Sequence, residues 1–316
     1  MDTVQKRIEK KLSRELGPLG EYLDDREVVE VMVNPDGGIW VEKLGSKPER
    51  KGMVESSIAL AVINTVSAAL NKTTNAQSPV LEGELPTDGS RFEGVVPPLV
   101  LSPAFSIRKR ASALFTLEQY VEDGIIAPDV KDRILASVKD RANILISGGT
   151  GSGKTTLANA ILAAIVDAHP NDRIIAIEDT YELQCAAENK VMLHSSIEVS
   201  MQDLLKATLR LRPDRIVVGE VRGSEALALL KAWNTGHPGG CCTVHANDPS
   251  AALQRLESLA AEGITTTKHL PALIVDAVDL VIQIARSPTG RRVNAVAKVE
   301  SHDGSKYITH NLVNSE

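Results

Sequence analysis

The sequence predicts an α/β protein in two parts, a domain with a largely parallel sheet preceded by a smaller α+β domain. From residue 143 onward, short apolar runs typical of buried strands alternate with helical segments, which favours a parallel sheet wrapped by helices. Residues 1–113 mix strands and helices in the α+β manner. At 316 residues, the chain is long enough for two hydrophobic cores.

In residues 1–113, the pattern predicts a helix, a hairpin, a second helix and further strands. Apolar residues at 4, 8, 12 and 16 predict an amphipathic helix with one buried stripe. Its basic face leaves contact with a membrane surface open. The extended runs 28–33 and 39–42 flank a turn-rich segment and predict a hairpin. The other expected elements are a helix at 56–70, strands at 91–96 and 104–108, and, in a second domain of residues 114–316, a helical pair near 117–139.

The composition excludes several classes of function. A net charge of −6 and a pI of about 5.7 argue against general nucleic-acid binding, and 3% aromatic residues argue against a base-stacking platform. The three cysteines form no spaced pair typical of a zinc ribbon or a disulfide framework. With no apolar run approaching 18 residues and no signal-peptide core, we expect a cytoplasmic protein that can still dock on a membrane-embedded partner.

A phosphate-binding loop opens the second domain's alternating pattern. Residues 148–155 fit G-x-x-x-x-G-K-[ST] between a predicted strand at 143–147 and a helical run at 156–162. Glycines let backbone N–H groups point at an anion, and the helix N-terminus adds its positive end. Lys154 is expected to reach the β- and γ-phosphates and Thr155 to hold Mg²⁺. The expected nucleotide-binding residues are Gly149, Thr150, Gly151, Ser152, Gly153, Lys154, Thr155 and Thr156.

Two later strands end in carboxylates. The run 173–177 leads into Glu178-Asp179-Thr180-Tyr181-Glu182, and carboxylates at this end of a parallel strand face the ligand crevice. One carboxylate of this box can polarise a water, and others can hold the metal's water shell; an acidic surface turn is the alternative. The run 216–218 ends in Gly219-Glu220, a Walker-B arrangement without its usual Asp. Glu178 and Glu220 are therefore metal candidates, with Glu220 acting through water.

Two histidines flank the next apolar run. His237 and His245 stand at the two ends of a predicted strand at 241–245, and we expect both to lie beside the nucleotide crevice. A neutral imidazole there can sense the γ-phosphate or relay its loss to a subunit boundary. A structural role for each histidine remains open. Zinc is not expected because no third ligand accompanies them at a suitable spacing.

The order of P-loop, Glu-Asp-x-x-Glu box, Gly-Glu Walker B and paired-His box resembles the secretion and traffic ATPases, and within them the conjugal-transfer (TrbB-like) ATPases of type IV secretion systems. The resemblance covers essentially the whole chain, including Val33-Asn34-Pro35, 88–91 and 106–109. It implies a RecA-like ATPase domain, hexameric rings, ATP and Mg²⁺ as cofactors, and an N-terminal domain that covers the nucleotide. The four-cysteine insert of type II relatives is absent, and Ala246-Asn247 favours the conjugation branch.

The resemblance also implies roles for individual residues. Glu182 would be the catalytic carboxylate, Arg91 and Arg108 would reach the nucleotide from the N-terminal domain, and Arg210 would act across a subunit boundary. The expected catalytic set is Glu182, Glu220, Lys154 and His245. The implied function is powering conjugative DNA or protein transfer, or pilus assembly, through inner-membrane partners and without sequence-specific nucleic-acid binding. A nucleotide-gated scaffold with negligible hydrolysis and a small-molecule P-loop kinase remain the alternatives.

Overall fold

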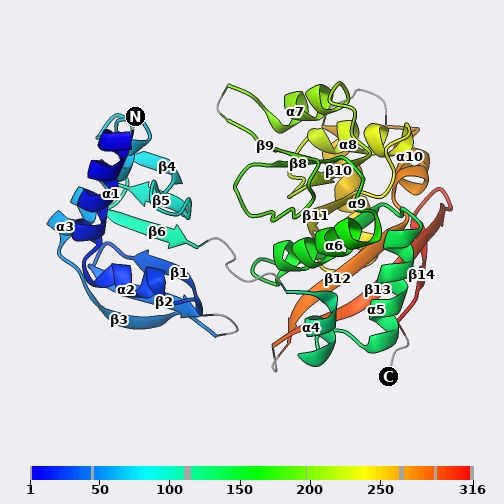
Figure 1. The fold of residues 1–316 in the computed structure, drawn as a ribbon, viewed down its shortest axis with the longest axis horizontal. Helices are drawn as coiled ribbons and strands as arrows, with labels where there is room; N and C mark the ends of the chain where they lie inside the picture. Colours follow the sequence, from blue (N-terminus) through cyan, green and yellow to red (C-terminus); the bar gives the residue numbers. More distant parts are fainter. Residues whose placement is uncertain are drawn as a thin grey trace. The chain divides into compact units, whose positions relative to one another are not determined.

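The computed structural model describes residues 2–43, 46–109, 115–196, 198–262, 267–287 and 290–313 (Figure 1). The chain divides into two compact units, Met1–Ser112 and Ala113–Glu316, here called unit 1 and unit 2. The domain boundary expected after residue 113 falls within residues 110–114, which lie outside the described ranges.

Unit 1 contains an antiparallel sheet with the strand order β3-β2-β1-β6-β5-β4. β1 and β2 form the hairpin predicted around Asn34-Pro35. All five residues of β3 are exposed, so no apolar pattern predicted this strand. The strands are β1 (Val28–Val33), β2 (Gly38–Lys43), β3 (Glu49–Met53), β4 (Val80–Glu84), β5 (Arg91–Val95) and β6 (Ala104–Arg108).

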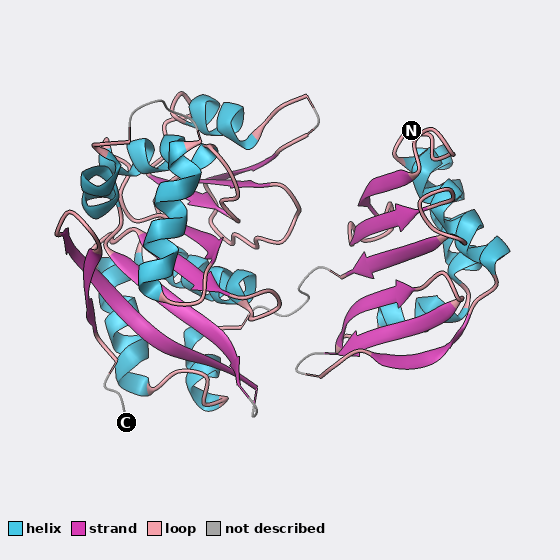
Figure 2. Ribbon diagram, turned by 180° about the vertical axis from the view of Figure 1, so that it is seen from behind, coloured by secondary structure: helices cyan, strands magenta, loops and turns pink. Residues whose placement is uncertain are grey.

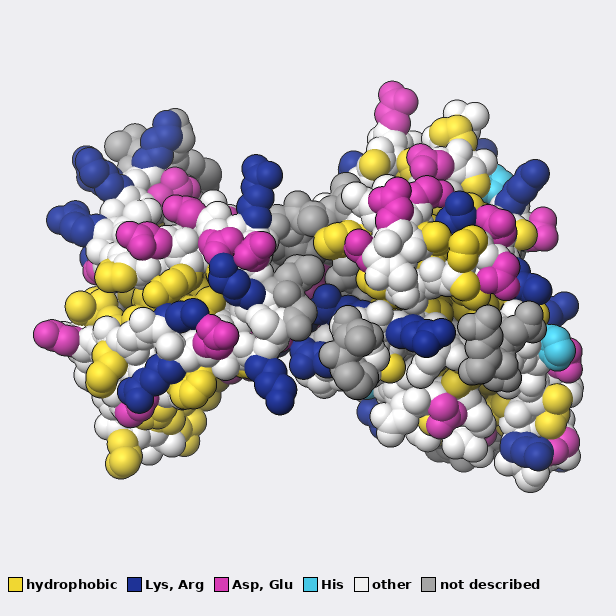
Figure 3. Space-filling model, turned by 90° about the horizontal axis from the view of Figure 1, so that it is seen from below, with side chains coloured by type: hydrophobic (Ala, Val, Ile, Leu, Met, Phe, Trp, Pro, Cys, Tyr) yellow, Lys and Arg dark blue, Asp and Glu magenta, His cyan; other side chains and the backbone are white. Residues whose placement is uncertain are grey.

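The helices of unit 1 close its hydrophobic core. They are α1 (Asp2–Leu16), α2 (Pro18–Asp24) and α3 (Ser56–Ala69). Leu12 of α1, Val62 of α3 and Ile107 of β6 are fully buried in one cluster. The N-terminal helix is therefore held by its apolar stripe, as an ordinary amphipathic helix is. On the face drawn in Figure 3, acidic and basic side chains are interspersed over each unit.

Unit 2 is built on a mixed sheet with the strand order β14-β13-β12-β7-β11-β10-β8-β9. Neighbouring strands from β12 to β9 are parallel, whereas β12, β13 and β14 form an antiparallel meander. The strands are β7 (Ile144–Gly148), β8 (Ile174–Glu178), β9 (Lys190–His194), β10 (Arg215–Val218), β11 (Cys241–His245), β12 (Leu280–Ser287), β13 (Gly290–His302) and β14 (Tyr307–Asn311).

Helices cover both faces of this sheet (Figure 2). Alternate side chains of one strand point to opposite faces, so Leu145 joins the cluster with α7 to α10, whereas Ile144 and Ile146 join the cluster with α4 to α6. The helices are α4 (Leu117–Glu122), α5 (Pro128–Lys139), α6 (Lys154–Ala168), α7 (Met201–Thr208), α8 (Glu225–Asn234), α9 (Pro249–Ala261) and α10 (Leu270–Ala277). Across the described ranges, no helix has the length and apolar character needed to span a membrane.

The parallel register brings the carboxyl ends of four strands to one edge of the sheet. His245 of β11 pairs with Gly148 of β7, and Val218 of β10 pairs with Ile177 of β8. The segments that leave these strands therefore begin side by side. This edge is where ligands bind in open α/β sheets.

Candidate nucleotide-binding site

The P-loop connects the end of β7 to the start of α6. Gly151 and Gly153 adopt the left-handed conformation, with φ values of 66° and 98°, which glycine reaches without a Cβ penalty. A Cβ on Gly148 would lie 2.5 Å from Ser152 Oγ. Because the loop has no room for side chains at these positions, its backbone can approach a ligand closely. Thr155 and Thr156 follow Lys154 in the first turn of α6 and are partly exposed.

Lys154 is folded back over this loop. Its side-chain nitrogen donates to the carbonyl oxygens of Gly148 and Gly149, each at 3.1 Å. The same nitrogen lies 3.3 Å from each ring nitrogen of His245. The P-loop cation is thus 7% exposed and held by neutral acceptors, which a phosphate oxygen can replace with a stronger, charge-assisted hydrogen bond.

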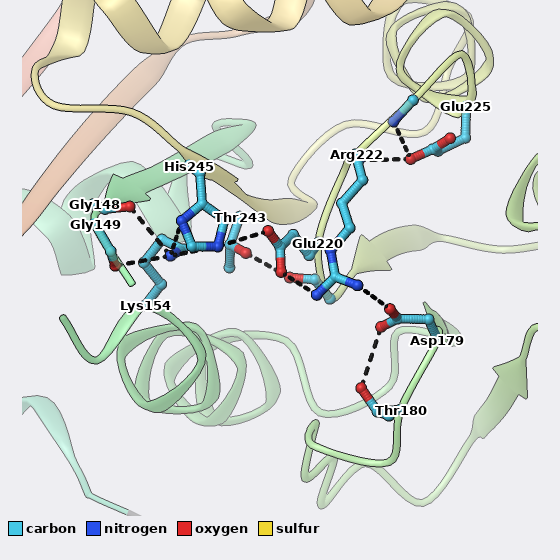
Figure 4. A network of polar contacts seen from close by, with 12 residues as sticks. Gly148, Gly149, Lys154, Asp179, Thr180, Glu220, Arg222, Glu225, Thr243 and His245 are labelled. Atoms are coloured by element: carbon cyan, nitrogen blue, oxygen red, sulfur yellow. Dashed lines mark hydrogen bonds and ion pairs between the residues drawn. The ribbon is translucent and has the colours of Figure 1, made fainter. Parts of the chain in front are cut away.

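A chain of charged contacts runs from His245 across the ends of the neighbouring strands (Figure 4). His245 Nε2 lies 3.0 Å from Glu220 Oε1. Arg222 contacts Glu220 Oε2 at 2.8 Å and Asp179 Oδ2 at 2.5 Å. The structure therefore brings together Lys154, His245 and Glu220, which the sequence named separately. The role of Arg222 was not predicted, although it follows Glu220 by two residues.

Glu178 is buried rather than open to a metal. One carboxylate oxygen accepts the backbone N–H groups of Glu182 at 2.9 Å and Leu183 at 2.8 Å, and the other lies 3.1 Å from His194 Nε2. Burial raises the pKa of Glu178 to about 7, although the two backbone N–H groups oppose the rise. These contacts do not fit the metal-ligand role expected of Glu178, because protein groups occupy both oxygens and the residue is 2% exposed.

Glu182 differs from Glu178 although both belong to the same acidic box. Its backbone is held by Glu178 and by Asn159, whose side-chain N–H donates to the Glu182 carbonyl at 3.0 Å. The carboxylate itself is partly exposed and accepts no hydrogen bond from the described residues. The Glu182 carboxylate can therefore contact a water molecule and accept its proton. The buried Glu178 carboxylate cannot, because it is only 2% exposed. Asn159, on the second turn of α6, had no predicted role.

Two arginines lie against the P-loop from the β12–β13 hairpin. Arg286 and Arg291 are directly opposite each other across the two strands. Arg286 Nε donates to the Gly151 carbonyl at 3.0 Å, and a Cβ on Gly153 would lie 2.9 Å from Arg291 Cδ. Like charges directly opposite each other are destabilising, so this pair is favourable only beside an anion or an acceptor. The sequence missed both residues because only the β12–β7 register brings them to the loop.

Two predicted residues of unit 2 lie away from this group. His237 precedes β11, at the amino edge of the sheet, and its Nδ1 lies 3.2 Å from the Ala232 carbonyl oxygen. The expectation that it lies beside the P-loop is wrong, because the loop leaves the opposite edge. Arg210 is exposed after α7. Arg91 and Arg108 are cross-strand partners within unit 1.

Comparisons with known proteins show which family this chain resembles. A family model described as "Type II/IV secretion system protein" matches residues 13–311. The chain is 49% identical to the conjugal transfer protein TrbB of Rhizobium radiobacter over 98% of this chain and 96% of that protein. These matches confirm the resemblance predicted from the four ordered boxes.

Solved structures show the same fold. The VirB11 ATPase of the Brucella suis type IV secretion system, in complex with sulphate, is 26% identical with a TM-score of 0.51, covering 93% of this chain and 96% of that one. The Legionella pneumophila ATPase DotB is 20% identical with a TM-score of 0.63, covering 87% of this chain and 77% of that one. The architecture of this chain is therefore that of the secretion ATPases.

Proposed function

The chain belongs to the type II/IV secretion system protein family, among the ATPases of type IV secretion and conjugation, and we propose that it hydrolyses ATP in a hexameric ring. The work of the ring is to power conjugative DNA or protein transfer, or pilus assembly. The observation that carries this proposal is the chain of contacts from Lys154 through His245 and Glu220 to Arg222. It links the P-loop, residues 148–155, here called the phosphate cradle, to the ends of neighbouring strands. Binding or loss of a phosphate at the cradle would therefore alter contacts beyond it.

The cradle supports binding of a triphosphate. Backbone N–H groups of the P-loop and of the start of α6 would bind the β- and γ-phosphates, and the glycines leave the loop backbone open to a ligand. When the phosphates arrive, Lys154 exchanges the Gly148 and Gly149 carbonyls for anionic oxygens. His245 then loses Lys154 as a neighbour but keeps Glu220. His245 thereby reports whether the γ-phosphate is present.

The donor set near Lys154 fits Mg²⁺, which takes few protein ligands and keeps several waters. When bound, Mg²⁺ neutralises charge on the β- and γ-phosphates and polarises them. The Thr155 hydroxyl would hold it from the first turn of α6. Glu220 would act on the metal only through its water shell and would not ligate it directly, because both of its oxygens already contact protein groups, His245 and Arg222.

The proposed base is Glu182. Its carboxylate accepts no hydrogen bond from the described residues, so it is free to orient a water and accept its proton. Lys154 would hold the phosphate that this water attacks; the Lys154 side-chain nitrogen lies 3.3 Å from His245, which in turn lies 3.0 Å from Glu220. A positioned base and a phosphate-binding cation each contribute to phosphate hydrolysis.

Unit 1 and a second subunit complete the site in this proposal. Arg91 and Arg108 lie on adjacent strands, directly opposite each other, so their side chains leave the same face of the sheet and can contact one anion. We propose that they reach the nucleotide from unit 1, the domain ending near residue 113, and that exposed Arg210 acts across a subunit boundary. The ring would be cytoplasmic and attached to inner-membrane components of the secretion system.

The test is phosphate release by the purified protein without any added acceptor, which a kinase would require. Lys154→Ala is expected to abolish turnover and weaken nucleotide binding, and Glu182→Gln to bind ATP but turn over about 10²–10⁴-fold more slowly. The matched controls, Lys139→Ala and Glu188→Gln, change exposed side chains of the same types. Unaltered turnover in folded Lys154→Ala protein refutes the assignment. ATP-dependent rings without phosphate release, seen by electron microscopy, support the scaffold alternative instead.

A further inference from the structure

The segment that follows β8 has no regular secondary structure, yet buried side chains fix its backbone. Residues 179–184 form bends and irregular chain after the strand end. Their polar backbone groups are bound by Glu178 and Asn159, each 2% exposed. Because this segment carries Glu182, whatever fixes its backbone also decides where the Glu182 carboxylate points.

Glu178 binds two consecutive N–H groups with one oxygen. The N–H groups of Glu182 and Leu183 lie 2.9 and 2.8 Å from Oε2, which closes a tight loop of chain on the end of β8. The other oxygen is held by His194 of β9, 3.1 Å away, and the Tyr181 ring lies against the His194 ring. The carboxyl group of Glu178 is therefore fixed from both sides.

Asn159 binds the same segment from the P-loop helix. Its Nδ2 donates to the Glu182 carbonyl at 3.0 Å, and its Oδ1 accepts from the Gln184 N–H at 2.8 Å. Asn159 lies five residues after Lys154 on α6. Hydrogen bonds therefore connect the backbone of Glu182 directly to α6, the helix that follows the P-loop.

This arrangement also explains an irregularity in the Walker-B segment. Gly219 stands where an Asp is usual, and a Cβ there would lie 3.0 Å from Glu178 Cβ. Few real Cβ contacts are this short, so a side chain at 219 would displace the buried Glu178. The glycine thus leaves space for Glu178 on the neighbouring strand.

We propose that Glu178 and Asn159 are positioning residues that aim the Glu182 carboxylate at the attacking water, and that Glu178 acts as a hydrogen-bond acceptor rather than as a charge or a metal ligand. This inference rests on the proposed function, in which Glu182 is the base. Displacement of a catalytic group by about 1 Å can cost on the order of 10²-fold in rate. Loss of either side chain should therefore lower turnover while leaving the phosphate cradle intact.

A glutamine at position 178 separates the two roles of the carboxylate. Its amide oxygen can accept the same two N–H groups, and its amide nitrogen can face His194. Burial already raises the pKa of Glu178 to about 7, so about half of the wild-type carboxyl groups are uncharged at neutral pH. If Glu178 only positions the segment, replacing it with an uncharged acceptor changes little. If Glu178 were a metal ligand or a base, the same replacement would remove that function.

The experiment compares Glu178→Ala, Glu178→Gln and Asn159→Ala in steady-state ATP hydrolysis and in nucleotide-binding titrations. We expect Glu178→Ala and Asn159→Ala to lower kcat by roughly 10- to 100-fold with nucleotide affinity little changed. Glu178→Gln is expected to rescue most of the turnover lost in Glu178→Ala. If Glu178→Ala does not fold, Asn159→Ala still tests the prediction, because alanine is favourable inside a helix.

Two outcomes overturn the inference. If the Glu178→Gln variant is as inactive as the Glu178→Ala variant, the charge of Glu178 is required. If the Asn159→Ala variant keeps the wild-type kcat, the segment does not need Asn159 to position it. Glu182→Gln, measured in the same assay, tests the proposed function separately. Normal turnover in that variant removes Glu182 as the base, whatever the Glu178 variants do.

Discussion

Glu178 should make the stability of unit 2 fall as pH rises, the reverse of what ordinary paired carboxylates do. Burial raises its pKa from 4.5 to about 7, so the folded protein binds this proton more tightly than the unfolded chain does. Its contribution to stability is full below pH 4.5 and is lost as pH rises through 7. Each pKa unit corresponds to about 1.4 kcal/mol, so the loss amounts to ~3 kcal/mol.

Glu178→Gln isolates this effect because the amide keeps the acceptor but does not titrate. Groups that do not interact with Glu178 titrate alike in both proteins and cancel in the difference between their unfolding free energies. That difference, variant minus wild type, is expected to increase by ~3 kcal/mol from pH 4.5 to pH 8. A change of this size is readily measured, because whole domains are stable by only about 5–15 kcal/mol.

Urea unfolding at several pH values measures the difference, with tryptophan fluorescence as the probe. Trp233 is buried in unit 2 at 3% exposure, and Trp40, the other tryptophan, lies in unit 1 on β2. Trp40→Phe in both proteins therefore restricts the probe to unit 2. Parallel stability curves would show that Glu178 titrates normally. A slope of opposite sign would show an ionised Glu178 paired with protonated His194.

Three further predictions concern the nucleotide. His245→Ala, which breaks the link between the P-loop and Glu220, should lower turnover in phosphate-release assays more than it lowers ATP affinity; a collapsed melting curve would instead show a structural role. Arg286→Ala should weaken ADP binding about fivefold, measured by calorimetry, because the hydrogen bond to Gly151, of about 1 kcal/mol, is lost. Unchanged affinity would show that this hydrogen bond does not support nucleotide binding. The chain from residue 114 onward should fold but bind ATP roughly 10²–10⁴-fold more weakly, and Arg108→Ala about 10- to 100-fold; full activity in both would exclude the unit 1 arginines.

The parts of the site that could be predicted depend on short-range sequence patterns. The P-loop is contiguous, so its glycines, Lys154 and the start of α6 follow from the motif alone. Glu220 and His245 could be expected near it because both end parallel strands, and such strand ends share one sheet edge. Placing His237 there failed because the same rule was applied to a residue before its strand rather than after it.

The remaining site residues depend on register and burial, which the motifs do not specify. Arg286 and Arg291 come long after the P-loop in the chain, and only the pairing of β12 with β7 brings them to Gly151 and Gly153. Glu178 and Glu182 carry the same functional group four residues apart. Their difference arises because Glu178 is still within β8, covered by β9, whereas Glu182 has left the strand.

The acidic segment after β8 is the place where two sets of contacts meet. Arg222 connects Asp179 to Glu220, and through it to His245 and the P-loop cation. Asn159 connects Glu182 to the P-loop helix. A phosphate that draws Lys154 away from His245 therefore acts, through Glu220 and Arg222, on the Asp179 end of the segment. The Glu182 end is fixed by Asn159 of α6. Such a segment can respond to the nucleotide at Asp179 and still keep Glu182, the proposed base, aligned, which a loop held at one point could not do.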